Sequence, residues 1–173
     1  MKTKNVFSVC LLILLALSSA SLKAQWWVTE TPPAGKVALH RLINVSSGKH
    51  IVATTPEAYS LISSGWSHES RLGFIQIASN PYPIYRYFKA SVGDHYASLS
   101  STAPSGYTLD GILGYAAPVS GSHSGGPSLY FSIHSYYRVS GGVDHLYSSD
   151  FSELGGGSYP WAYEGIAFNI WAF

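Results

Sequence analysis

The sequence is almost without cysteine and is poor in charge. Its one cysteine, Cys10, lies in an apolar run near the N-terminus, so no disulfide can close within the chain. The fold must therefore be held by its core alone. Charged residues make up only 11% of the chain, whereas 17 glycines and 13 tyrosines are present. Because exposed helix faces are usually rich in Lys, Glu and Arg, this balance favours β-structure with many turns.

No apolar run is long enough to span a bilayer, which takes about 20 residues. The longest one, residues 9–17, follows a basic start and precedes small residues that end at Ala24. This order predicts a secretory signal peptide over residues 1–24, with cleavage after Ala24 or, alternatively, after Ala20. We therefore expect a secreted or periplasmic protein with no transmembrane segment and with a single domain over residues 25–173.

Basic charge is scarce beyond the predicted signal peptide. Three of the 10 Lys and Arg residues lie within it, which leaves seven beside nine Asp and Glu. No stretch of the chain forms a basic stripe. The sequence therefore argues against nucleic acid and anionic lipid as partners.

Motifs that would indicate catalysis are also missing. The chain has no Gly-x-Ser-x-Gly elbow, no phosphate-cradling glycine loop followed by Lys-Ser/Thr, and no close His-x-x-x-His pair. We therefore predict no catalytic residues, no cofactor and no metal site, and we do not expect an enzyme.

What the sequence does contain is one short pattern that occurs three times. The clearest copy consists of Tyr85-Arg86-Tyr87-Phe88, Gly93-Asp94-His95-Tyr96 and the segment from Gly106 to Tyr115. The copies define repeats over about residues 37–78, 84–117 and 129–173. Each copy reads as a hairpin, a short helical or irregular linker and a closing strand. In the first linker, Thr55 is the predicted N-cap of a short helix.

One such unit cannot bury both faces of its hairpin, but three units around a shared axis can. The sequence therefore predicts a mainly β fold of three pseudo-symmetric repeats of about 45 residues. We expect a β-trefoil-like arrangement with short helical turns between strands. A small propeller and an open stack of three units are the alternatives, although propellers usually need at least four blades.

The repeat resembles a widespread family of secreted tandem repeats of unknown function. The likeness lies in Tyr85-Arg86-Tyr87, in Gly93-Asp94-His95-Tyr96, and in the closing segments with Asp110-Gly111-Ile112 and Glu164-Gly165-Ile166-Ala167. Members of that family often accompany cell-wall hydrolases, so the resemblance implies an accessory role at glycans or cell surfaces. It implies no defined activity.

The chain departs from the family pattern at three places. Lys49 replaces the aspartate of the first Asp-His pair, and Ser70-Arg71 replaces a Gly-Ile pair. His134 stands near the place of the third arginine. The first copy of any Asp-His ligand site would therefore be damaged or different.

The candidate site residues are a recurrent trio, an arginine on the first strand, a histidine on the second and an acid before the closing strand. They are Arg41, His50 and Glu69 in the first repeat; Arg86, Asp94, His95 and Asp110 in the second; and Asp144, His145 and Glu164 in the third. The favoured interpretation is a set of structural hydrogen bonds within each repeat, because residues that stabilise the fold of a repeat should occur in every copy of it. A ligand pocket in each repeat, with a tyrosine or tryptophan stacked on a sugar, is the alternative.

These observations lead to one functional hypothesis and two alternatives. We expect a non-catalytic binding module for a glycan or another cell-envelope component, with repeated sites that allow avidity. The first alternative is a structural or protein-interaction domain without a small ligand. The second is a small envelope hydrolase, which would need two carboxylates about 5–10 Å apart.

Overall fold

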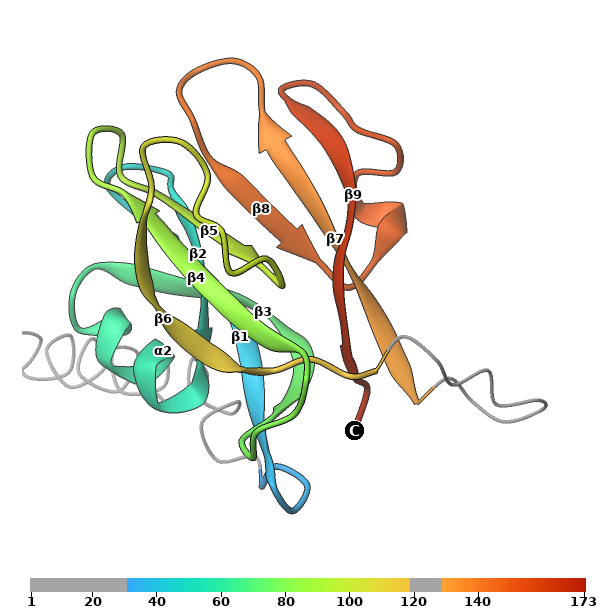
Figure 1. The fold of residues 1–173 in the computed structure, drawn as a ribbon. Coiled ribbons are helices and arrows are strands. Elements are labelled where there is room, and N and C mark those ends of the chain that lie inside the picture. Colours follow the sequence, from blue (N-terminus) through green and yellow to red (C-terminus); the bar gives the residue numbers. More distant parts are fainter. Residues whose placement is uncertain (1–30, 119–128) are drawn as a thin grey trace, which may run out of the picture. The chain divides into compact units, whose positions relative to one another are not determined.

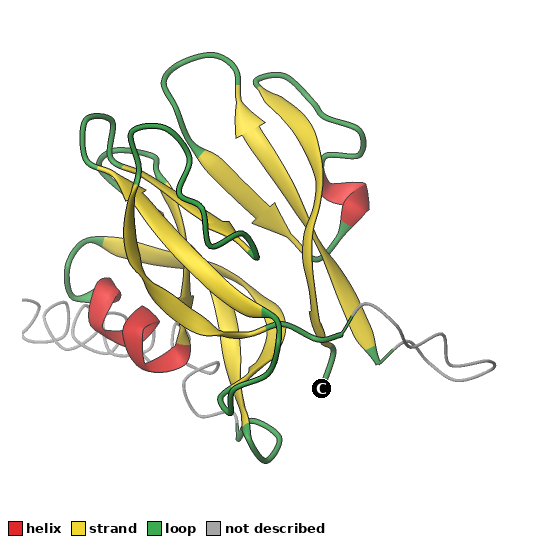
Figure 2. Ribbon diagram, viewed as in Figure 1, coloured by secondary structure: helices red, strands yellow, loops and turns green. Residues whose placement is uncertain are grey.

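The computed structural model describes residues 31–118 and 129–173. The predicted signal peptide over residues 1–24 and its cleavage site after Ala24 lie outside the described residues. The described part is mainly β-structure with one short α-helix and one 3₁₀ turn (Figure 2). The expected fold class is confirmed at this level.

The strands and helical segments follow the order expected from the repeats. They are β1 (Lys36–Asn44), β2 (His50–Thr54), α2 (Thr55–Ile62), β3 (Trp66–Gln76), β4 (Pro83–Lys89), β5 (Asp94–Ser98), β6 (Thr108–Tyr115), β7 (Tyr130–Arg138), β8 (His145–Ser148), a 3₁₀ turn (Phe151–Glu153) and β9 (Trp161–Trp171). Figure 1 shows them in the colour order of the chain. The segment between β5 and β6 has no helix.

The strands pair as three antiparallel triplets. In the first triplet β1 lies between β2 and β3, in the second β4 lies between β5 and β6, and in the third β7 lies between β8 and β9. The central strand of a triplet has neighbours at both edges. Accordingly β1 is buried continuously from Ala38 to Leu42 instead of alternating between buried and exposed residues.

The closing strands β3, β6 and β9 join the triplets into one sheet. Gln76 of β3 pairs with Tyr115 of β6, and Phe74 of β3 pairs with Trp171 of β9. Just beyond β6, the Ala117 N–H donates to the Asn169 carbonyl of β9 at 2.8 Å. The three closing strands therefore meet near their C-terminal ends.

Each closing strand contains two register shifts against its central strand. They occur at matching positions: beside Leu39/His40 and Arg41/Leu42 in β1, Ile84/Tyr85 and Arg86/Tyr87 in β4, and Ile133/His134 and Ser135/Tyr136 in β7. The residues left without a partner in the second shift are Glu69, Asp110 and Glu164. Because a bulge re-aims a side chain, it can turn these acids toward the central strand.

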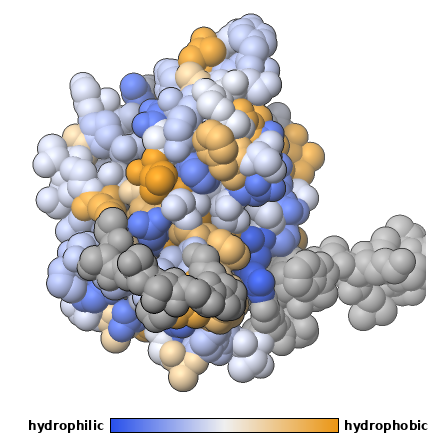
Figure 3. Space-filling model, turned by 90° about the vertical axis from the view of Figure 1, so that its right-hand side faces the viewer, coloured by the Kyte–Doolittle hydropathy of each residue, from blue (hydrophilic) through white to orange (hydrophobic). Residues whose placement is uncertain are grey.

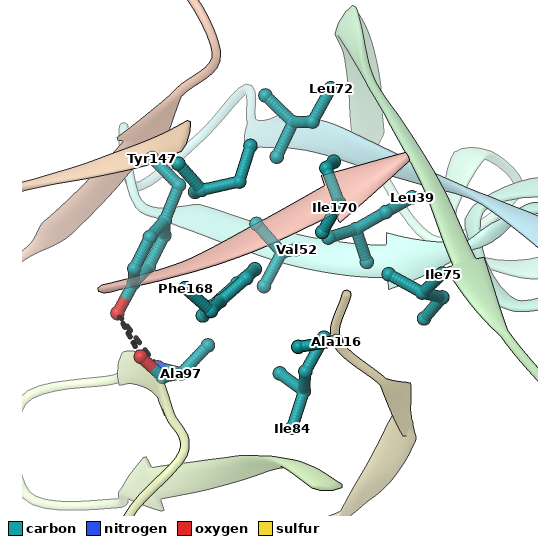
Figure 4. Close-up of a cluster of buried hydrophobic side chains, with 11 residues drawn as sticks. Leu39, Val52, Leu72, Ile75, Ile84, Ala97, Ala116, Tyr147, Phe168 and Ile170 are labelled. Atoms are coloured by element: carbon teal, nitrogen blue, oxygen red, sulfur yellow. Dashed lines mark hydrogen bonds between the residues drawn. The ribbon is translucent and has the colours of Figure 1, made fainter. Parts of the chain in front are cut away.

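The core draws residues from all three triplets (Figure 4). Leu39 and Ile75 come from the first triplet, Ile84 from the second, and Phe168 and Ile170 from the third. A buried tyrosine of the third triplet, Tyr147, also enters the core. Its hydroxyl donates to the Ala97 carbonyl at 3.0 Å and accepts from the Ala97 N–H at 2.7 Å, so the polar end of this large side chain is satisfied.

The start of α2 differs slightly from the prediction. Thr54, not Thr55, is the residue before the helix, and Pro56 lies in its first turn. The Thr55 hydroxyl is instead 2.9 Å from Nε2 of the buried His40. Among the described residues, no helix has the length and hydrophobicity needed to cross a membrane.

Some apolar side chains are exposed on the surface of the described residues. On the face drawn in Figure 3 they stand in patches between hydrophilic residues. The described residues include several exposed apolar side chains, among them Tyr159 and Ile77.

Candidate ligand-binding site between the second and third triplets

Two arginines are held inside the domain in the same manner. Arg41 donates from Nε to Glu69 at 2.9 Å and from Nη1 to the Tyr147 carbonyl at 3.0 Å. Arg86 donates from Nε to Asp110 at 2.6 Å and from Nη1 to the Val52 carbonyl at 3.0 Å. In each case the acid is the bulge residue of the same triplet, and the carbonyl belongs to another triplet.

Each arginine also binds an acid that the sequence did not single out as part of the trio. Glu57, in the first turn of α2, receives Nη1 and Nη2 of Arg86 at 2.9 and 2.6 Å. Glu153, in the 3₁₀ turn, receives the same two groups of Arg41 at 3.1 and 2.8 Å. Both acids follow the second strand of a triplet by a similar interval, which is the signal that could have identified them.

The aspartates of the Asp-His pairs bind histidines of other triplets. Asp144 accepts the His50 N–H at 3.0 Å and lies 2.8 Å from His50 Nδ1. Asp94 accepts the His145 N–H at 3.0 Å and lies 2.7 Å from His145 Nδ1. The expectation of bonds within each repeat is therefore wrong for these two acids, because the aspartate points across the boundary between triplets.

These contacts shift the protonation of the buried groups. Burial works to lower the pKa of His50, but its hydrogen bonds to Asp144 and Glu69 outweigh burial and raise that pKa above its ordinary value. Burial likewise works to raise the pKa of Asp94. The hydrogen bonds from His145 and from the Tyr107 hydroxyl outweigh burial and hold the Asp94 pKa below its usual range.

The third histidine, His95, has a different setting. The residue that would correspond to Asp94 and Asp144 is Lys49, whose Nζ donates to the Val143 carbonyl. The buried Nδ1 of His95 has no hydrogen-bond partner. Burial, followed by the positive charge of Arg86, lowers the pKa of His95. The replacement of the first repeat's aspartate by Lys49 therefore leaves Nδ1 of His95, in the second triplet, without a hydrogen-bond partner.

His50, His95 and His145 nevertheless each contact an aromatic ring of a neighbouring triplet. The ring belongs to the first residue of a closing strand or to the residue just before it. The ring centroids are 6.2 Å apart for Trp66 and His95, 6.3 Å for Tyr107 and His145, and 5.6 Å for His50 and Trp161. Each pair is edge-to-face, an arrangement that stabilises ring contacts beyond their burial.

A pocket of about 390 Å³ opens at the boundary between the second and third triplets. Its volume lies in the range of small-ligand sites, about 300–1,000 Å³. It is lined by Lys89, Tyr96, Pro104, Tyr107, Tyr137, Val143, His145 and Glu164. Three tyrosine rings and three ionisable groups therefore converge on one hollow.

The polar groups of this pocket are oriented by buried partners. Asp94, which is fully buried, accepts hydrogen bonds from the Tyr107 hydroxyl and from Nδ1 of His145. The other ring nitrogen of His145, Nε2, lies 3.8 Å from Glu164 Oε2. The ammonium of Lys89 lies 5.3 Å from the centroid of the Tyr107 ring. The pocket thus offers aromatic faces beside fixed donors and acceptors.

The position of β7 that matches Arg41 and Arg86 is Ser135, the residue next to His134. Arg41 pairs with Val52, Arg86 with Ala97 and Ser135 with Tyr147 in the three hairpins. The register shifts in the closing strands, which the sequence pattern does not reveal, set this alignment. His134 instead lies 3.0 Å from the Tyr163 hydroxyl.

The predicted site residues thus form three groups. Arg41, His50 and Glu69 meet Asp144, Arg86 meets Asp110 with His95 nearby, and Asp94 meets His145 with Glu164 nearby. Of the ten, His145 and Glu164 line the pocket. The described residues contain no group of three His, Cys, Asp or Glu side chains placed to hold a metal ion.

One family model is similar to part of the chain. A domain of unknown function (DUF5648) matches residues 19–103. The match covers slightly less than half of the chain and contains, within the described residues, the first triplet and the β4–β5 hairpin. No curated protein and no solved structure matches the chain. The resemblance to secreted tandem repeats beside cell-wall hydrolases stays a prediction.

Proposed function

We propose that this protein is a secreted, non-catalytic binding module for a glycan or another cell-envelope component. The observation that carries the proposal is the pocket of about 390 Å³ that Tyr96, Tyr107 and Tyr137 line together with His145 and Glu164. Aromatic faces stack on the apolar faces of sugars, and carboxylate and imidazole groups accept or donate hydrogen bonds to hydroxyls. Export would bring such a module to the cell envelope.

The three triplets, in this proposal, are repeats of one unit in a β-trefoil-like arrangement. The matching register shifts in β3, β6 and β9 support it, as do the two arginines with matching partners. The repeats have diverged, since Ser135 and Lys49 differ from their counterparts. The proposal therefore assigns the glycan ligand to the pocket at this one boundary and not to three equal sites.

Most of the recurrent trio serves the frame in this proposal. Arg41 and Arg86 are each bound by two carboxylates and a carbonyl, and their side chains are 9% exposed. Groups so fully engaged inside the domain have little capacity left for a ligand. The ligand contacts are therefore assigned to the pocket residues and not to these arginines.

A glycan array probed with the mature protein at high density tests the proposal. We expect binding to a restricted set of glycans, and we expect the Tyr137→Ala variant to lose at least tenfold in affinity for them. Ile43→Ala is the matched control, because Ile43 pairs with His50 as Tyr137 pairs with His145, yet it does not line the pocket. A folded protein that stays silent across glycans and isolated envelope fractions would overturn the proposal.

A domain that only scaffolds protein contacts remains the second candidate, favoured by the number of carboxylates engaged in internal ion pairs. It predicts that Tyr137→Ala changes nothing beyond stability. A small envelope hydrolase is the less favoured alternative, because Glu164 is the one acid among the described residues that lines this pocket and glycoside hydrolysis uses two. Zymography on peptidoglycan without clearing would dismiss it.

A further inference from the structure

The first and second triplets each enclose one guanidinium group of the chain itself. In both, a bulge acid takes Nε, a carbonyl of another triplet takes Nη1, and a second acid takes Nη1 and Nη2 in a fork. Planar guanidinium groups match such paired carboxylate oxygens closely. The domain therefore already displays, twice, how it binds this chemical group.

The third triplet keeps part of this arrangement but has no arginine at the position that matches Arg41 and Arg86. Ser135 stands at the matching position of β7, and the bulge acid Glu164 is retained. The Ser135 hydroxyl donates to Glu164 Oε2 at 2.7 Å, and the Glu164 side chain is 38% exposed, compared with 26% for Glu69 and 32% for Asp110. The ion pairs among the described residues give Glu164 no lysine or arginine partner.

A pocket of about 310 Å³ lies where the missing side chain would run. It is lined by Tyr96, Ser98, Ser135, Glu164, Gly165, Ile166 and Ala167. The segment between β5 and β6 contains no acid that could replace Glu57 or Glu153. The Ala97 carbonyl, which corresponds to the carbonyls that Arg41 and Arg86 bind, receives the Tyr147 hydroxyl instead. Glu164 and the serine hydroxyls are therefore the acceptors that a ligand would meet.

We propose that this Ser135–Glu164 pocket binds a guanidinium group supplied from outside the domain, such as an arginine side chain of a peptide or a small guanidino compound. The group would pair with the Glu164 carboxylate and reach the hydroxyls of Ser98 and Ser135, while Tyr96 offers a ring against which the plane can stack. The proposal stands on the empty arginine position and does not require a glycan ligand.

Titration of the folded protein with N-acetyl-arginine amide, followed by amide NMR shifts at Gly165 and Ile166, tests the proposal. One carboxylate at a partly open site predicts weak binding, with a Kd of about 1 mM. The neutral citrulline analogue should bind at least tenfold more weakly, because it lacks the charge and part of the donor fork. Unchanged spectra, or equal affinity for the two compounds, would overturn the proposal.

The Ser135→Arg variant is the decisive one, because it places the chain's own guanidinium beside Glu164. We expect it to fold, to keep at least the parent's stability and to lose the response to the arginine compound. Ser132→Arg, on the same strand, adds the same charge but leaves the pocket open and should retain the response. A Ser135→Arg protein that binds the compound as well as the parent does would contradict the proposal.

Comparing an arginine-containing peptide with the small arginine compound shows where the bound guanidinium group comes from. Tenfold tighter binding of a short peptide with an internal arginine would point to a protein partner, whereas equal affinity would point to a small guanidino compound. The Tyr137→Ala variant should retain the arginine response because Tyr137 does not line this pocket. Failure of the glycan proposal and failure of the guanidinium proposal are therefore distinguishable.

Discussion

Among single residues, Lys49 and His95 show most directly what one substitution changes. Asp94 and Asp144 each bind a histidine of another triplet through its backbone N–H and Nδ1. His95 packs against Trp66 as the other histidines pack against their aromatic neighbours, yet its Nδ1 is buried without a partner. A buried polar nitrogen without a hydrogen-bond partner costs about 1–3 kcal/mol.

We therefore predict that Lys49→Asp stabilises the domain by about 1–2 kcal/mol, because the new carboxylate can accept from His95. Urea denaturation measures the change, and the pKa of His95 from NMR titration should rise. Lys49→Ala is the control, since it removes the Lys49–Val143 contact without adding an acceptor. Equal stability of the aspartate and alanine variants would contradict the prediction.

His40 gives a second prediction at this scale. This histidine is fully buried, and its ring nitrogens lie 3.1 Å from His68 Nε2 and 2.9 Å from the Thr55 hydroxyl. Burial, together with the positive charges of His68 and Arg71, lowers the pKa of His40 to about 3. The unfolded chain, with an ordinary histidine pKa of about 6.5, binds this proton more readily. The buried, neutral His40 therefore makes its full contribution to the free energy of unfolding above about pH 6.5. As the pH drops toward 3, that contribution falls by up to about 1.4 kcal/mol per pH unit.

The His40→Gln variant should remove this part of the acid sensitivity. We expect its unfolding free energy to fall less steeply than that of the parent between pH 6.5 and 4, as measured by urea denaturation at each pH. Comparing the two proteins cancels the groups remote from His40 that titrate in the same range, including His50, so the difference reports the His40–His68 pair. Parallel pH profiles would contradict the assignment to His40.

At the scale of the element, the bulged closing strand is the feature that builds the polar sites. Its second register shift places Glu69 and Asp110 beside the arginines, and Glu164 beside Ser135. A regular strand would alternate its side chains strictly between the two faces. The bulges therefore decide which acid faces the central strand and which faces solvent.

Gly114 of β6 tests how tightly the closing strands contact one another. Its φ is +151°, and a Cβ atom there would lie 2.8 Å from Ile75 Cδ1 and 2.9 Å from the Gln76 carbonyl oxygen. We predict that Gly114→Ala destabilises the domain by about 1–3 kcal/mol. Gly111→Ala on the same strand meets no atom within 4 Å and should change stability by less than about 0.5 kcal/mol in the same denaturation experiment. Similar losses in both variants would contradict this account.

For the whole molecule, the contacts between triplets decide whether the described domain unfolds as one unit. Asp144 is fully buried and joins the third triplet to the first through His50. We predict that Asp144→Ala lowers the unfolding free energy by about 3–5 kcal/mol, because it leaves the buried His50 donors unpaired. Fluorescence and circular dichroism should still report one coincident transition.

The Asp144→Ala variant also distinguishes residues that stabilise the fold from residues that bind a ligand. Asp144 does not line the pocket between the second and third triplets, so any ligand bound there should keep its affinity for the folded variant. Two separate transitions, or a loss below about 1 kcal/mol, would contradict the role given to Asp144.

The sequence by itself determined the order of the hairpins, linkers and closing strands and the mainly β class, because these depend on local apolar runs and on turns such as the one around Gly48. It also indicated that Arg41, Arg86 and their bulge acids belong together, since their spacing recurs. The tertiary structure alone decided that Asp94 and Asp144 bind histidines of other triplets and that Ser135, not His134, takes the third arginine position. Both results depend on bulge register and on contacts between triplets, which join residues far apart in the chain and leave no local pattern.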